Sequence, residues 1–187
     1  MYKKNRENRD LNSIASSFSA FDEASCAEII RIAKESDSTT GSIYQDNLSV
    51  DKTIRSSKIF YIDEQAYGGL YDTIKQIFKA ANDWRFSISS VPAIQVIRYG
   101  IGDKYEKHTD WSPNNLHRKL SLSIQLSQPT DYEGGEVLFH AGPEPVEMPF
   151  IIGNGCVWPS FVLHEVKPVT SGERWALVAW AHGEKFA

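Results

Sequence analysis

The stretch Leu120–Leu126 reads Leu-Ser-Leu-Ser-Ile-Gln-Leu, an alternation of apolar and polar side chains. Successive side chains of a β-strand point to opposite faces, so this alternation predicts a strand with one apolar and one polar face. The apolar face is suited to pack against helices. The polar face, formed by Ser121, Ser123 and Gln125, could line a ligand-containing barrel or face solvent, and the alternation leaves both open.

Outward from this strand, the chain after residue 84 consists of short β-rich runs separated by turns that contain Gly, Pro or Asn. Runs of this length and spacing are typical of a β-sandwich or jelly roll. The predicted strands are Trp84–Ser89, Ala93–Tyr99, Tyr105–Asp110, Lys119–Leu126, Glu136–His140, Cys156–Trp158, Val162–Lys167 and Arg174–Ala181.

The first half of the chain is predicted to mix helix and strand. One helix is expected to begin with Ser19 as its N-cap and to carry an apolar face within Cys26–Ala33. A strand is predicted at Arg55–Ile62, and a second amphipathic helix at Leu70–Asn82. The expected fold class is therefore mainly β, with helices that flank the sheets.

Length and composition limit the protein class. The chain has 187 residues, of which 41% are hydrophobic, so a disordered chain is excluded and about one domain is expected. We predict a single domain over residues 1–187, with a core at about residues 93–181. Residues 1–17 are polar and are expected to be flexible. They lack the apolar segment of a secretory signal, and no apolar run is long enough to cross a membrane.

Charge and cysteine content narrow the expected partners and location. The net charge is −4 and no block of Lys or Arg occurs, which disfavours nucleic acid as a partner but leaves a local basic groove open. Cys26 and Cys156 are too few for a disulfide framework, so a reducing, cytoplasmic location is expected. Cys156 is interpreted as a small buried hydrophobe.

Three residues are candidate catalytic metal ligands. His108 and Asp110 lie two residues apart, which on an extended strand directs both side chains to one point. A lone His-x-Asp is more often just the polar end of a strand, but His164 supplies a second imidazole. Two histidines and one carboxylate form the facial triad of non-haem Fe(II) oxygenases, which leaves positions open for substrate and O₂. Zinc uses the same ligands, and these residues alone do not decide between the metals.

Arg174 is a candidate anion-binding residue. It lies ten residues after His164, at the start of a predicted strand. Its planar guanidinium can bind a carboxylate through two hydrogen bonds, and it needs an anionic partner if it is buried. The alternative is a surface arginine paired with Glu173 or Glu184, which the residue taken alone favours.

Together these four residues resemble the active-site signature of iron- and 2-oxoglutarate-dependent dioxygenases. The flanking sequence is similar to that of the prolyl 4-hydroxylase-like branch of the superfamily, including its bacterial and phage members. The resemblance covers about Ala93–Trp180. The motifs that carry it are Arg98–Asp110 (RYGIGDKYEKHTD), Tyr132–Glu136 (YEGGE) and His164–Arg174 (HEVKPVTSGER).

The resemblance implies a double-stranded β-helix in which His108, Asp110 and His164 hold Fe(II). It also implies that 2-oxoglutarate chelates the metal and pairs its far carboxylate with Arg174, that O₂ is the oxidant, and that ascorbate serves as a reductant. Gln125 stands where some relatives have a tyrosine, a departure for which Ser123 could compensate. The further residues implied to bind the co-substrate are Tyr99, Tyr105, Ser123, Gln125 and Trp180.

The function implied by the resemblance is hydroxylation of prolyl residues in a protein or peptide, with release of succinate and CO₂. Hydroxylation of a free amino acid or other small molecule is an alternative, as is a non-catalytic jelly-roll module with a structural or lost metal. Demethylation of nucleic acid ranks low, because Trp180 stands where that family usually has a second arginine. Substrate choice is expected to depend on the loops Ser38–Thr53 and Trp111–Arg118.

The remaining histidines and two tryptophans are expected to have no role in the chemistry. The three histidines are interpreted as non-ligands and the tryptophans as core residues: His117, His140, His182, Trp158 and Trp175.

Overall fold

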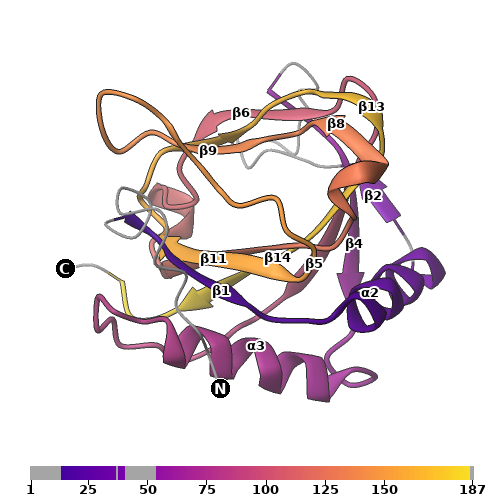
Figure 1. Ribbon diagram of the computed structural model, residues 1–187. Helices are drawn as coiled ribbons and strands as arrows, with labels where there is room; N and C mark the ends of the chain where they lie inside the picture. The colour runs from indigo at the N-terminus through magenta and orange to yellow at the C-terminus, as the bar shows by residue number, and fades with distance from the viewer. Residues whose placement is uncertain (1–13, 37, 41–53, 186–187) are drawn as a thin grey trace.

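The computed structural model describes residues 14–36, 38–40 and 54–185, which form two facing β-sheets with helices outside the larger one (Figure 1). The larger sheet has seven strands, in the order β1-β11-β7-β14-β5-β4-β2. Their bounds are β1 Ser16–Ser19, β11 Asn154–Pro159, β7 Arg118–Gln125, β14 Arg174–His182, β5 Ile94–Tyr99, β4 Lys58–Ile62 and β2 Ser38–Thr40.

The smaller sheet has five strands, in the order β10-β9-β12-β6-β3, and a two-stranded sheet pairs β13 with β8. This two-sheet arrangement confirms the predicted jelly-roll architecture. The bounds are β10 Val146–Glu147, β9 Val137–Phe139, β12 His164–Val166, β6 Lys104–His108, β3 Arg55–Ser56, β13 Val169–Gly172 and β8 Tyr132–Gly134, with short 3-10 helices at Pro113–Asn115 and Pro129–Asp131.

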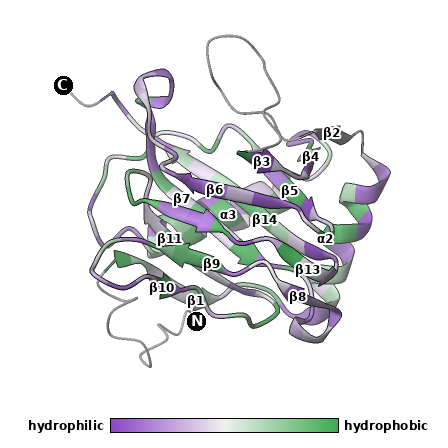
Figure 2. Ribbon diagram, turned by 90° about the horizontal axis from the view of Figure 1, so that it is seen from above, coloured by the Kyte–Doolittle hydropathy of each residue, from purple (hydrophilic) through white to green (hydrophobic). Residues whose placement is uncertain are grey.

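Helices α2 (Glu23–Glu35) and α3 (Gly68–Ala80) pack on the outer face of the larger sheet. In Figure 2 the ribbon of α2 changes between green and purple along its length, as expected for a helix with one buried face. Apolar residues of both helices share one core cluster with Leu120, Leu122 and Ile124 of β7. None of the described helices is long and apolar enough to cross a membrane.

The polar face of β7 points into the space between the sheets. Ser121, Ser123 and Gln125 are all buried, so the solvent-facing alternative for this face is wrong. Burial of these groups follows from the second sheet, which covers the inner face of the first and excludes water from it. The small hydroxyls leave room there for a cavity.

Two predictions in the first half of the chain are wrong. Ser19 is not a helix N-cap, because Ser16–Ser19 pairs with β11 as strand β1, and Asp22 caps α2 instead by accepting a hydrogen bond from Ser25 N at 2.8 Å. The same pairing contradicts flexibility for Ser16 and Ser17. Residues 1–13 of the predicted flexible segment lie outside the described residues, as do residues 41–53 of the predicted substrate loop.

The predicted strand Trp84–Ser89 is also wrong, because this segment forms no regular strand. The side chain of Asn82 donates to Phe86 O at 2.7 Å and accepts from Phe86 N at 3.0 Å. Both backbone groups of Phe86 are thereby used by a side chain instead of a neighbouring strand. Local hydrogen bonding therefore overrides the β-propensity of the aromatic residues.

Candidate active site

Two histidines that are far apart in the sequence face each other across paired strands. His108 ends β6 and His164 begins β12, and the antiparallel register places them directly opposite one another. The centroids of their rings lie 4.2 Å apart. Strand pairing, and not sequence spacing, therefore brings the two imidazoles together.

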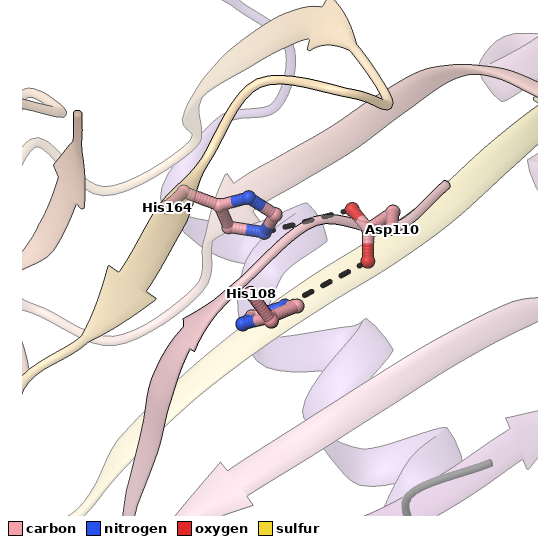
Figure 3. A group of neighbouring side chains, drawn as sticks. All are labelled: His108, Asp110 and His164. Atoms are coloured by element: carbon pink, nitrogen blue, oxygen red, sulfur yellow. Dashed lines mark ion pairs between the residues drawn. The ribbon is translucent and has the colours of Figure 1, made fainter. Parts of the chain in front are cut away.

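Asp110 completes the group from the turn that follows β6 (Figure 3). Its carboxylate oxygens lie 3.7 Å from His108 Nε2 and 3.5 Å from His164 Nε2. The expected strand Tyr105–Asp110 is too long, since β6 ends at His108. The backbone N–H of Asp110 donates to Ser160 O at 2.9 Å, and the Ser121 hydroxyl donates to Asp110 Oδ2 at 2.6 Å. These two hydrogen bonds aim the carboxylate at the histidines.

The protonation of the three side chains suits a divalent metal ion. His108 Nδ1 lies 2.8 Å from Glu106 O and His164 Nδ1 lies 3.0 Å from Val162 O, so each Nδ1 donates its hydrogen and each Nε2 keeps its lone pair. The ligand atoms of all three residues lie within 4.8 Å of one another. They therefore fit one metal ion bound on a single face.

Burial and charge reinforce this protonation state. Burial and the neighbouring His164 lower the pKa of His108 to about 3, which keeps that imidazole neutral. Burial alone would raise the pKa of Asp110, but the two histidines and Arg118 outweigh it, so the pKa lies below its usual value. A carboxylate and two neutral imidazoles are the ligands that non-haem Fe(II) prefers.

Arg174 is buried at the start of β14, with 1% of its surface exposed. Its Nε has no hydrogen-bond partner among the described residues, and Tyr99 lies directly opposite it on β5. Glu173 pairs with Arg98 instead, so the surface-pair alternative for Arg174 is wrong. A Cβ atom on Gly135, which has φ +70°, would lie 2.9 Å from Arg174 Cδ. The glycine therefore leaves room for a buried cation that fits a carboxylate.

A single cavity of about 270 Å³ connects the three candidate metal ligands with Arg174. Four of the other residues predicted to bind the co-substrate also line it, namely Tyr99, Tyr105, Ser123 and Trp180. The structure does not place Gln125 on the cavity wall. Its amide instead donates to Ser127 O and to the Tyr132 hydroxyl, each at 3.0 Å.

Two residues near the site were not predicted. The Tyr132 hydroxyl lies beside Arg174, which opposes the rise in the pKa of Tyr132 that burial causes. Trp158 was assigned to the core, yet it lines the cavity and packs edge-on against His164, with ring centroids 5.0 Å apart. Tyr132 lies within the YEGGE motif, which could have indicated it. Trp158 shows only an apolar strand pattern, which does not separate a cavity wall from a core.

The other histidines lie outside the ligand group within the described part of the chain. His140 Nε2 lies 2.9 Å from Glu165 Oε1, and His117 Nδ1 lies 3.2 Å from Gly183 O. The ring of His182 faces that of His117. Their placement agrees with their interpretation as non-ligands.

Comparison with known proteins also points to an Fe(II)-binding oxygenase site. The model of the 2OG-Fe(II) oxygenase superfamily matches residues 94–182. A PKHD-type hydroxylase of Picosynechococcus sp. is 36% identical over 84 residues, which are 44% of this chain and 38% of that protein. One from Synechococcus sp. is 38% identical over 97 residues, which are 50% of this chain and 42% of that protein. The chain therefore spans about two fifths of the length of these relatives.

A solved structure has the same fold over almost the whole chain. A Pseudomonas putida prolyl-4-hydroxylase superposes with a TM-score of 0.74 at 24% identity, covering 94% of this chain and 96% of the other. That likeness concerns the fold, whereas the superfamily match covers all four residues of the metal and anion sites. Residues 94–182 therefore match the 2OG-Fe(II) oxygenase superfamily, and the chain has the fold of a prolyl-4-hydroxylase.

Proposed function

We propose that the protein is an Fe(II)- and 2-oxoglutarate-dependent oxygenase that hydroxylates prolyl residues in a protein or peptide. The observation that carries the proposal is the cavity that joins one carboxylate and two neutral imidazoles to a buried arginine whose Nε has no hydrogen-bond partner among the described residues. When bound, the metal and co-substrate supply the oxidation by O₂, in which 2-oxoglutarate leaves as succinate and CO₂.

Each group of the chain has a defined part in this proposal. His108, Asp110 and His164 hold the metal through two Nε2 atoms and one carboxylate oxygen. Arg174 binds the far carboxylate of 2-oxoglutarate, and Tyr99 packs beside it on the neighbouring strand. Trp158 and Phe139 pack against His164 and keep water away from that side of the metal ligands.

The choice of a prolyl substrate rests on the fold and on the sequence motifs. Besides the Pseudomonas enzyme, a prolyl hydroxylase of Trichoplax adhaerens, solved in complex with a hypoxia inducible factor peptide fragment, superposes with a TM-score of 0.75 at 23% identity. It covers 92% of this chain and 86% of its own. The Trichoplax enzyme, solved with a peptide, supports a peptide substrate over a free amino acid.

We expect proline-containing polypeptides to stimulate succinate release and to gain one oxygen on proline. The assay incubates the protein with Fe(II), 2-oxoglutarate, ascorbate and a proline-rich peptide, followed by mass spectrometry of the peptide. The matched control is the same peptide with alanine in place of each proline. Stimulation by free amino acids and by none of the peptides would support the small-molecule alternative instead. Absence of succinate release under all conditions would contradict the proposed oxygenase and support the alternative of a non-catalytic jelly-roll module.

A second expected result concerns Tyr132, whose hydroxyl lies between the Gln125 amide and Arg174. We expect Tyr132→Phe to weaken 2-oxoglutarate binding by roughly 5- to 10-fold, the cost of losing one hydrogen bond that positions the guanidinium. Titration of 2-oxoglutarate into the iron-loaded protein measures it, and iron affinity should not change.

The matched control for this result is Tyr71→Phe. The hydroxyl of Tyr71 bonds Ile62 O and Ile94 N behind the larger sheet, away from the cavity. This variant should lose stability but keep its affinity for 2-oxoglutarate. Equal affinity in the Tyr132 variant and the wild type would show that Tyr132 does not position Arg174.

A further inference from the structure

Two more arginines line the same cavity and have no part in the proposed binding of metal or 2-oxoglutarate. Arg55 has only 7% of its surface exposed. Its Nε donates to Ser57 Oγ at 3.3 Å, and its Cζ lies 4.7 Å from the centroid of the Tyr105 ring. Tyr105 in turn stacks on His108 with ring centroids 3.5 Å apart. The Arg55 guanidinium is therefore separated from a metal ligand by one aromatic ring.

Arg118 lies at the start of β7, and its charge, like that of Arg55, lowers the pKa of Tyr105 against the rise that burial causes. Its Cζ is 4.0 Å from the centroid of the Trp180 ring, and its Nη1 donates a long hydrogen bond, 3.5 Å, to Asp110 O. Its Nε is buried without a hydrogen-bond partner in the described part of the chain. Burial lowers the pKa of Arg118, and the positive charge of Arg55 lowers it further. The negative charge of Asp110 raises it, but by less than burial lowers it. The two guanidinium groups thus repel one another.

The charges on the cavity wall do not balance. Its lining includes three arginines and one carboxylate, Asp110, which gives a formal charge of +2 when the histidines are neutral. A divalent metal ion and a dianionic co-substrate cancel each other, so this excess remains when both are bound. In residues 14–36, 38–40 and 54–185, neither Arg55 nor Arg118 forms a salt bridge with a carboxylate. A buried cation without an anion is costly, so an anion that binds here gains affinity.

A co-substrate carboxylate bound at Arg174 does not supply the anion for Arg118, because these two arginines lie at opposite ends of the site. Arg174 begins β14, whereas Arg118 pairs with His182 at the other end of that strand. β14 has nine residues, so its two ends lie roughly 25 Å apart. Tyr61 lines the same cavity, is half exposed and lies close enough to Arg118 to affect its pKa. The end of the cavity at Arg118 is therefore open to solvent.

We propose that Arg55 and Arg118 bind a carboxylate of the substrate, so that the preferred substrate is an acidic peptide with Asp or Glu close to the hydroxylated proline. This inference rests on the proposed function for the identity of the target residue. A terminal carboxylate presents the same chemistry as an acidic side chain, and the experiment separates the two sources.

The test measures binding and hydroxylation of matched peptides. Fluorescently labelled, C-terminally amidated peptides with one proline carry Asp or Asn at each neighbouring position in turn. A further neutral peptide ends in a free carboxylate next to the proline, and free proline serves as a competitor. Anisotropy titrations use the full chain with Fe(II) and 2-oxoglutarate without O₂, so that no turnover occurs. The same peptides are then incubated in air and analysed for a gain of one oxygen.

We expect the best Asp peptide to bind about 30-fold more tightly than its Asn counterpart, the fold-change for a lost buried charge pair. Arg55→Gln should remove most of this difference, and Arg55→Lys should retain part of it. The matched control is Arg31→Gln on the exposed surface of α2, where Arg31 pairs with Glu28 and Glu35. It should keep the full difference. Unchanged affinity of each variant for the Asn peptide shows that the fold is intact.

The outcomes separate this inference from the proposed function. Equal binding of all carboxylate-bearing and neutral probes, or an Asp preference that survives in both Arg55→Gln and Arg118→Gln, overturns the inference. A preference for the free terminus alone keeps carboxylate recognition and assigns it to a chain end. Oxygen gain on neutral and acidic peptides alike supports the proposed function without the inference. Arg55-dependent acidic binding with no oxygen on proline keeps the inference and refutes prolyl hydroxylation.

Discussion

The Asp110→Ala variant is expected to lose metal-dependent turnover entirely. The substitution leaves two neutral imidazoles, which bind a hard divalent ion weakly without the carboxylate charge. Asp110→Glu is expected to lose activity almost as completely, because one extra methylene displaces the oxygen by about 1 Å, which costs roughly 100-fold. Succinate release and iron content of the purified variants measure both effects.

The matched control for this result is Asp72→Ala, an exposed aspartate on α3 that takes no part in the site. It should keep full iron content and activity. Thermal unfolding of each variant shows whether loss of activity reflects loss of the fold, since Asp110 also accepts the hydrogen bond of Ser121. A folded Ala variant that retains iron and full activity would remove Asp110 from the metal site.

The Arg174→Ala variant is expected to lose two to four orders of magnitude in affinity for 2-oxoglutarate. Arg174 is 1% exposed and its Nε has no partner among the described residues, so without the guanidinium the far carboxylate of the co-substrate would be left unpaired in a largely dry cavity. Loss of one partner of a buried ion pair costs about 3–5 kcal/mol. Titration of 2-oxoglutarate into the iron-loaded variants measures this loss.

The conservative variant provides the comparison for Arg174. Arg174→Lys should do less harm, because the positive charge remains and only the two-pronged hydrogen bonding is lost. Iron affinity should stay near that of the wild type in both variants, since Arg174 takes no part in the His-Asp-His group. Equal affinities for 2-oxoglutarate in wild type, Lys and Ala proteins would contradict the assignment.

Several features of the fold and of the site were predictable from local sequence. The alternation over Leu120–Leu126 predicts a strand, and β7 covers all but its last residue. The amphipathic pattern at Leu70–Asn82 predicts α3, which is observed over Gly68–Ala80. The residue types and order of His108, Asp110 and His164 indicate a facial triad before any geometry is available, because few other functions need that combination.

Other features depend on partners that are distant in the sequence. Ser16–Ser19 has no marked strand pattern of its own and becomes β1 only by pairing with β11. Arg55 was predicted only as part of a strand, and Trp158 only as a core residue. Their positions on the cavity wall follow from the packing of one sheet on the other.

The sequence by itself determined the type of secondary structure where apolar side chains recur periodically, as in β7 and α3, and the chemistry of the site through the kinds of residues present. Tertiary structure alone decided which residues meet. The β6–β12 register places His108 opposite His164, and closure of the two sheets buries the hydroxyls of β7. The physical reason is that periodicity is a property of neighbouring residues. Strand register, burial and the balance of charge in a cavity depend on contacts between segments that lie far apart in the chain.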